Sequence, residues 1–172
     1  MLLAAALPAS AQSAAELRTA DVTLRFEAGA DAPRLVSLQP SGQESWSNRA
    51  PESLVSSAES KGESVALHWK FDPQASIIEA RHVVFVYNSE SPRLRLSWEW
   101  TARADFGPVE HKVRIENLDT HEFWLPLQDS FRFDWQVDPQ AALEQMYVEK
   151  GDGSPSDEGT HEVSLASGYK WT

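Results

Sequence analysis

Cysteine is missing from all 172 residues of the chain. Its absence excludes a disulfide framework, a thiol nucleophile and a sulfur-ligated zinc site. Long apolar runs are missing as well. The apolar run at residues 2–7 is far too short to cross a bilayer. We therefore expect no membrane-spanning segment.

Basic residues are scarce relative to acidic ones. The chain has 15 Lys and Arg against 26 Asp and Glu, which gives a net charge of −11. Nucleic acids and anionic membranes are bound by basic surfaces. We expect neither as a partner.

The usual metal and nucleophile motifs are also missing. None of the five histidines is followed by another at helical spacing, and there is no Gly-x-Ser-x-Gly motif. His111 interrupts an apolar row, which is more typical of a hydrogen-bonded core histidine than of a metal ligand. The acidic loop at 152–158 lacks the residue order of a calcium loop. We predict no metal, no cofactor and no catalytic residue in this chain.

Aromatic residues, by contrast, are plentiful, with seven Trp and seven Phe. The clearest pattern lies between Pro92 and Trp135, where apolar and polar residues alternate with a period of two. The apolar positions of the first strand are Leu94, Leu96, Trp98 and Trp100. The pattern resumes at 109–115 and again at 123–135. It predicts three consecutive antiparallel strands with one buried face.

Shorter alternating segments precede and follow this centre. We predict strands at 22–26, 35–38, 65–71, 77–87, 145–148 and 162–171. The apolar run at 83–87 indicates either a strand covered on both faces or a strand shifted by a bulge near 79–81. The polar stretch at 41–64 is interpreted as a loop or weak edge strand, and 138–144 as one short helical turn. Strands without alternating helices favour an all-β fold, an antiparallel β-sandwich.

The N-terminus resembles a signal peptide. The apolar residues 2–7 are followed by the small triplet Ala9-Ser10-Ala11, which a signal peptidase accepts. We expect a secreted or periplasmic bacterial protein, with residues 1–11 as a signal-peptide remnant, 12–20 as an exposed leader and 21–172 as the sandwich domain.

Besides His111, two residues depart from the alternation. Trp124 falls on the polar face of its predicted strand, where it could form a platform for a sugar ring or pack beneath a neighbouring domain. Asp129 falls in the apolar row, which favours a bulge or turn cap over a catalytic carboxylate.

One segment resembles a known family. Residues 107–118, read as Gly-Pro-Val-Glu-His-Lys-Val-Arg-Ile-Glu-Asn-Leu, are similar to a strand of the N-terminal β-supersandwich of clan D glycoside hydrolases, the α-galactosidase (melibiase) group. Residues 123–135, 147–151 and 158–161 continue the resemblance, which covers about residues 90–172. It implies a galactose-mutarotase-like sandwich. Because the family's sandwich is longer, we expect the fold to be incomplete at the C-terminus.

The resemblance implies an exported enzyme that cleaves α-galactosidic bonds with retention. In the family the catalytic aspartates lie on a (β/α)₈ barrel that follows the sandwich, so no catalytic residue is carried over to this chain. The carbohydrate substrate would be reached through that separate domain. Sandwich loops in the family can contribute to the sugar pocket, and we take Lys150, Asp152 and His161 as candidate hydroxyl partners beside Trp124. The alternative is a free-standing carbohydrate-binding or surface interaction module.

Overall fold

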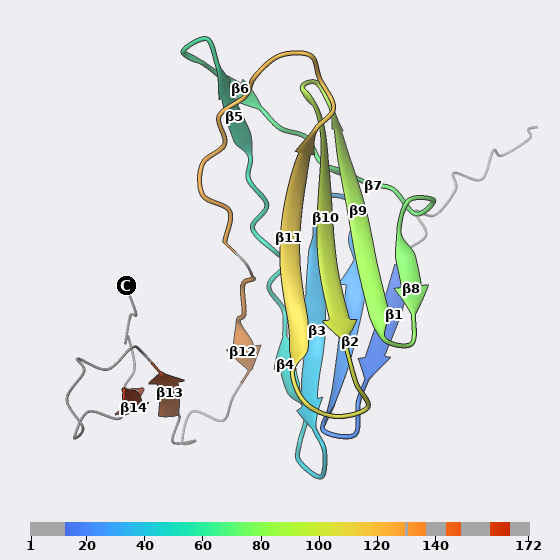
Figure 1. Cartoon of the computed structure of the whole chain (residues 1–172), viewed down its shortest axis with the longest axis vertical. Coiled ribbons are helices and arrows are strands. Elements are labelled where there is room, and N and C mark those ends of the chain that lie inside the picture. Colours follow the sequence, from blue (N-terminus) through green and yellow to red (C-terminus); the bar gives the residue numbers. More distant parts are fainter. Residues whose placement is uncertain (1–12, 130, 137–143, 149–158, 166–172) are drawn as a thin grey trace, which may run out of the picture. The chain divides into compact units, whose positions relative to one another are not determined.

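The structure is a computed structural model that describes residues 13–129, 131–136, 144–148 and 159–165 (Figure 1). Every regular element within these ranges is a β-strand. The described residues contain no helix that is long and apolar enough to cross a membrane. The chain divides into two compact units, residues 1–136 and 137–172.

The first unit contains two antiparallel sheets and a small hairpin. One sheet has the order β1 (Ser13–Arg18), β2 (Val22–Ala28), β3 (Pro33–Pro40), β4 (Trp46–Asn48) and β12 (Trp135–Gln136). The other has the order β11 (Val109–Asn117), β10 (Arg93–Ala102), β9 (His82–Glu90) and β7 (Lys70–Phe71), with β8 (Ile77–Glu79) also paired to β9. The hairpin pairs β5 (Ser57–Ser60) with β6 (Glu63–Ala66).

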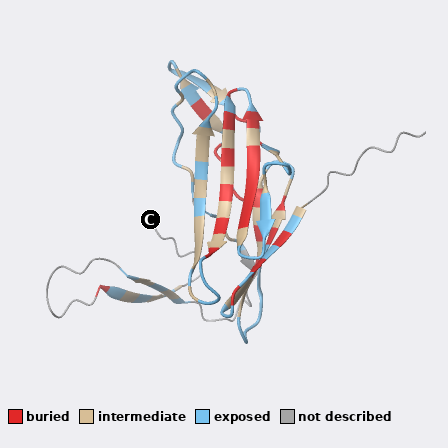
Figure 2. Ribbon diagram, turned by 45° about the vertical axis from the view of Figure 1, so that its right-hand side comes forward, coloured by how far each residue is buried: buried red, intermediate tan, exposed pale blue. Residues whose placement is uncertain are grey.

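Aromatic side chains from both sheets meet in one core. Phe26 of β2 lies edge-on to Trp98 of β10, with ring centroids 5.5 Å apart, and contacts Trp100 at 5.3 Å. Phe85 of β9 stacks on Trp98 at 6.0 Å. Figure 2 shows the buried residues running along β9 and β10. Because the two sheets bury their apolar faces against each other, the prediction of an all-β sandwich is confirmed.

Strand β10 follows the predicted alternation, since its even-numbered apolar residues are all buried. It pairs with β11 on one side and β9 on the other. Residues 83–87 of β9 are buried at consecutive positions, which agrees with the first of the two alternatives, a strand covered on both faces. The predicted strand 77–87 is divided at residues 80–81 into β8 and β9.

The prediction of an exposed leader at 12–20 is wrong for residues 13–18. These residues form β1, an edge strand that pairs antiparallel with β2. Ala15 and Leu17 point into the core, and Leu17 is fully buried. The strand was missed because its only apolar inward-facing residues are one alanine and one leucine.

The prediction of a third strand beside β11 is also wrong. Of the described residues, 123–129 and 131–134 form no ladder with β11, which pairs with β10. The segment at 123–134 makes an isolated antiparallel bridge from Trp124 to Glu59 and then leads to β12, which joins β4 in the other sheet. Pro126 lacks the backbone N–H that a ladder requires, so the segment is poorly suited to be a regular strand.

The second unit is described as one hairpin. Strand β13 (Glu144–Val148) pairs antiparallel with β14 (Thr160–Ser164), and Tyr147 lies opposite His161. The strand predicted at 145–148 is confirmed, and β14 overlaps the start of the one predicted at 162–171. The proposed signal-peptide remnant at 1–11 and most of the helical turn at 138–144 lie outside the described residues.

Candidate functional site

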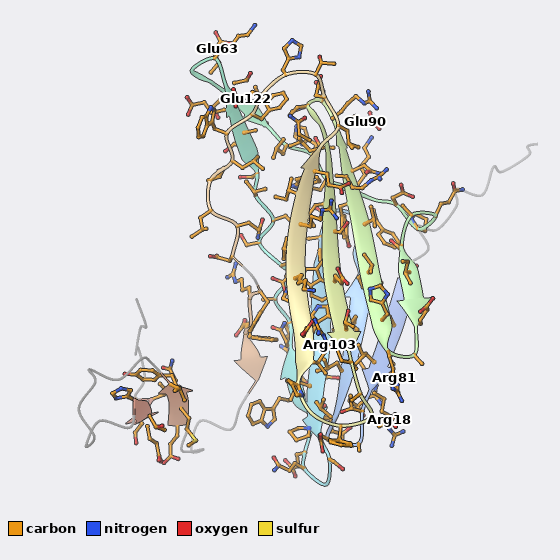
Figure 3. All side chains as sticks on the ribbon, in the orientation of Figure 1. Arg18, Glu63, Arg81, Glu90, Arg103 and Glu122 are labelled. Atoms are coloured by element: carbon orange, nitrogen blue, oxygen red, sulfur yellow. The ribbon has the colours of Figure 1, made fainter. Side chains whose placement is uncertain are left out.

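An open depression lies where three connections meet at one end of the sandwich. The connections are the β5–β6 turn, the β9–β10 turn and the loop after β11. The depression has a volume of about 420 Å³ and is lined by Ser60, Lys61, Glu63, Val65, Ser91, Pro92, Asp119, His121 and Phe123. Figure 3 shows that Glu63 and Glu122 project at this end, whereas Arg18, Arg81 and Arg103 project at the opposite end.

The β5–β6 turn is shaped by its backbone. Lys61 and Gly62 both have positive φ, 53° and 81°, as in the tight turns that favour hairpins. The Ser60 hydroxyl donates to the carbonyl of Glu122 at 3.3 Å. This bond ties the turn to the loop after β11.

Asp119 organises the loop after β11. Its carboxylate accepts hydrogen bonds from the backbone N–H of Thr120 at 2.8 Å and of Arg93 at 3.4 Å. These bonds, followed by His121, favour the charged form and lower the pKa of Asp119. The carboxylate therefore stabilises the loop. The depression as a whole offers hydroxyl and carboxylate groups to a polar solute.

Trp124 is the first of the sequence-predicted site residues. Its side chain is 70% exposed. Its backbone exchanges two hydrogen bonds of 2.8 Å with Glu59. Phe123 lines the depression, and neighbouring side chains in extended backbone point to opposite faces. Trp124 therefore faces away from the depression.

Of the other three predicted site residues, only His161 is among the described residues. Lys150 and Asp152 lie outside the described residues. His161 lies on β14 in the second unit, and its ring stacks on Tyr147 with centroids 4.7 Å apart. Trp124 belongs to the first unit, so the proposed grouping of all four residues stays a prediction.

His111 and Asp129, the two polar residues in apolar rows, differ in their burial. His111 is half-buried on β11, its Nδ1 lies 2.8 Å from the carbonyl oxygen of Glu99, and its ring stacks on Trp100 at 4.2 Å. The predicted hydrogen bond and apolar neighbours of His111 are confirmed, whereas its side chain is only half-buried. Asp129 is exposed, so its place in the apolar row does not reflect burial.

A buried polar cluster that the sequence did not indicate lies between two segments of the first unit. Glu52 is only 6% exposed, and its Oε2 accepts a hydrogen bond of 2.8 Å from the backbone N–H of Arg132. Burial raises the pKa of Glu52 from 4.5 to about 7. Asn48 is 3% exposed and bonds several backbone groups. Both residues lie in the polar stretch interpreted as a loop or weak edge strand, and Asn48 is the last residue of β4. Arg132 is 80 residues away from Glu52 along the chain, so no local pattern indicated the contact.

Three large apolar side chains of one parity are exposed between residues 125 and 131, and we call them the apolar strip. The exposed fractions are 37% for Leu125, 95% for Leu127 and 43% for Phe131. Isolated exposed apolar residues are ordinary, but a series of them is typical of a surface that other protein covers. Figure 1 shows the segment passing beside β5 on the outside of the sheets.

Within the described ranges, no three histidine or carboxylate side chains come together as a metal site. Comparisons with protein-family models, curated proteins and solved structures find no match to this chain.

Proposed function

We propose that this chain is the N-terminal accessory β-sandwich of an exported glycoside hydrolase that acts on α-galactosides. In this proposal a separate catalytic barrel holds the acid/base and nucleophile groups. The sandwich supports that barrel and performs no chemistry itself. The second unit would contribute Lys150, Asp152 and His161 to the rim of the sugar pocket.

The apolar strip is the observation that carries the proposal. Leu127 is almost fully exposed, although burying such a side chain would contribute about 2 kcal/mol. An accessory domain needs such a surface to pack on its catalytic partner.

Strand β11 supports the family assignment. The segment that resembles the clan D sandwich, residues 107–118, contains the whole of β11, which is the edge strand of its sheet. The antiparallel two-sheet architecture agrees with what that resemblance implies. The N-terminal residues 2–11 support export.

Carbene footprinting of the apolar strip tests the packing role. We expect Leu127 and Phe131 to be labelled strongly in the 172-residue chain. Labelling should fall at least about fivefold in the longer protein that carries the barrel, because packing excludes the reagent. The measurement is mass spectrometry of the peptide that spans 123–133.

Ile77 and Ile78 on β8 provide the internal control, because they are 39% and 50% exposed and lie on a different segment. Their labelling should be the same in both proteins. Leu127→Ser should restore labelling of Phe131 in the longer protein, whereas Ile78→Ser should not. Equal labelling of the strip in both proteins would rule out the packing role.

A free-standing carbohydrate-binding module is the second candidate. The exposed ring of Trp124, whose backbone is fixed to Glu59, is the observation that favours it. Binding of the 172-residue chain to a glycan array distinguishes the candidates. The module requires binding that Trp124→Ala abolishes, and the accessory domain requires none.

A further inference from the structure

Three side chains attach residues 128–134 to residues 48–55, and we call them the latch. The Gln128 Oε1 accepts from the backbone N–H of Val55 at 2.6 Å. The Glu52 Oε2 accepts from the N–H of Arg132 at 2.8 Å. The Asn48 Oδ1 accepts from the N–H of Asp134 at 2.7 Å. The latch thus consists of Asn48, Glu52 and Gln128.

Glu52 is the unusual member of the latch. Its Oε1 is buried and has no hydrogen-bond partner in the described part of the chain. A buried carboxylate anion with one unsatisfied oxygen is costly, whereas a neutral carboxylic acid is much less so. The neutral form keeps a carbonyl oxygen that can still accept from Arg132. Geometry therefore favours the protonated side chain in the closed latch.

The charged groups around Glu52 act in opposite directions. From the 128–134 segment, Arg132 favours the anion through its backbone N–H and its charge, and Asp129 opposes it. On the β3 side, where the Pro33 carbonyl accepts from the Glu52 N–H at 2.8 Å, the neighbouring Arg34 forms an ion pair with Glu27 of β2. On the β4 side, Arg49 is exposed. Burial is the largest influence and raises the pKa of Glu52 to about 7.

We propose that Glu52 makes the latch proton-dependent: the protonated side chain holds residues 128–134 closed on residues 48–55, and loss of the proton loosens them. Phe131 of the apolar strip lies within the latched segment. Where the proposed function holds, the proton would therefore also set how firmly the strip is presented to the barrel.

The direction follows from linkage. The pKa of Glu52 is about 7 when the latch is closed and 4.5 when the side chain is solvated. The closed form binds more protons between these values, so its stability is greatest at low pH and falls as pH rises through this window. With these two pKa values, the equilibrium constant for opening of the latch increases roughly thirtyfold between about pH 5.5 and about pH 8.5.

Amide hydrogen exchange of the whole chain tests the inference. After correction for the intrinsic base-catalysed rate, we expect the protection of the Arg132 and Asp134 amides to fall roughly thirtyfold between about pH 5.5 and about pH 8.5. The amides of β10 should change little over the same range. Glu52→Gln keeps an acceptor oxygen and cannot ionise, so its protection at Arg132 should not depend on pH.

Gln128→Ala is the matched variant. It removes a latch bond without removing the carboxyl group, so it should lower protection at both pH values and keep the pH step. Equal protection of wild-type Arg132 at both values, or a step that persists in Glu52→Gln, would overturn the inference. Carbon-13 titration of the Glu52 carboxyl group in the wild type decides the matter if Glu52→Gln does not fold, since a pKa near 4.5 would also overturn it. None of these readouts depends on glycosidase activity.

Discussion

Replacing Trp98 by alanine is expected to lower the free energy of unfolding by about 4 kcal/mol, the range found for large aromatic side chains in cores. Trp98 is fully buried at the centre of the sandwich. Its ring contacts Phe26 across the two sheets and Phe85 on the neighbouring strand. The substitution would leave a cavity between the two sheets, and the sheet backbones cannot move close enough together to fill it. Urea denaturation followed by far-ultraviolet circular dichroism measures the change.

Trp124→Ala provides the control for this substitution, because it removes the same side chain from a position that is 70% exposed. We expect it to change the free energy of unfolding by less than about 0.5 kcal/mol. Similar losses from the two substitutions would show that Trp98 does not join the two sheets as described.

Replacing Asn48 by alanine is expected to cost about 3 kcal/mol, because the buried amide satisfies backbone groups on several segments. Its Nδ2 donates to the carbonyl of Leu35 at 2.9 Å, and its Oδ1 accepts from Ala50 at 3.1 Å and from Asp134 at 2.7 Å. Alanine would leave these buried groups without partners. The loss should appear both in thermal unfolding and as faster exchange of the Asp134 amide.

The exposed amide of Gln39 is the comparison for Asn48, since its only side-chain bond is one of 3.3 Å to the Gln43 carbonyl in the described part of the chain. Gln39→Ala should be nearly neutral. An Asn48→Ala variant as stable as Gln39→Ala would mean that the buried amide does not connect β4 to the 128–136 segment.

The fold class could be predicted from sequence where one face of a strand is covered and the other is not. Strand β10 shows this clearly, because Leu94, Leu96 and Trp98 alternate with Arg95 and Ser97. Such a period of two fixes which side chains share a face. It also placed His111 among apolar neighbours, and the structure shows the half-buried ring stacked on Trp100 and hydrogen-bonded to Glu99.

Alternation did not predict burial correctly in two other segments. Leu125 and Leu127 alternate like core residues but are exposed, because a period of two identifies the two faces of a segment and not which face is covered. In β1 the opposite error occurred, since Ala15 and Leu17 give too weak a signal for a buried strand.

The candidate sites could be predicted only in part. Trp124 was expected to be an exposed aromatic and is one. Glu52 and Asn48 could not be recognised, because their partners Arg132 and Asp134 are 80 and 86 residues away and their own stretch is polar. The burial of Glu52 depends on a contact with a segment that is distant in sequence, so it can be recognised only in the three-dimensional structure.

Turnover of p-nitrophenyl α-galactoside is the most direct test of the claim that this sandwich supports chemistry performed on another domain. The account predicts no hydrolysis above the buffer rate by the purified 172-residue chain, and hydrolysis by the longer protein that includes the barrel. Hydrolysis by the 172-residue chain alone that a point substitution within it abolishes would contradict the account.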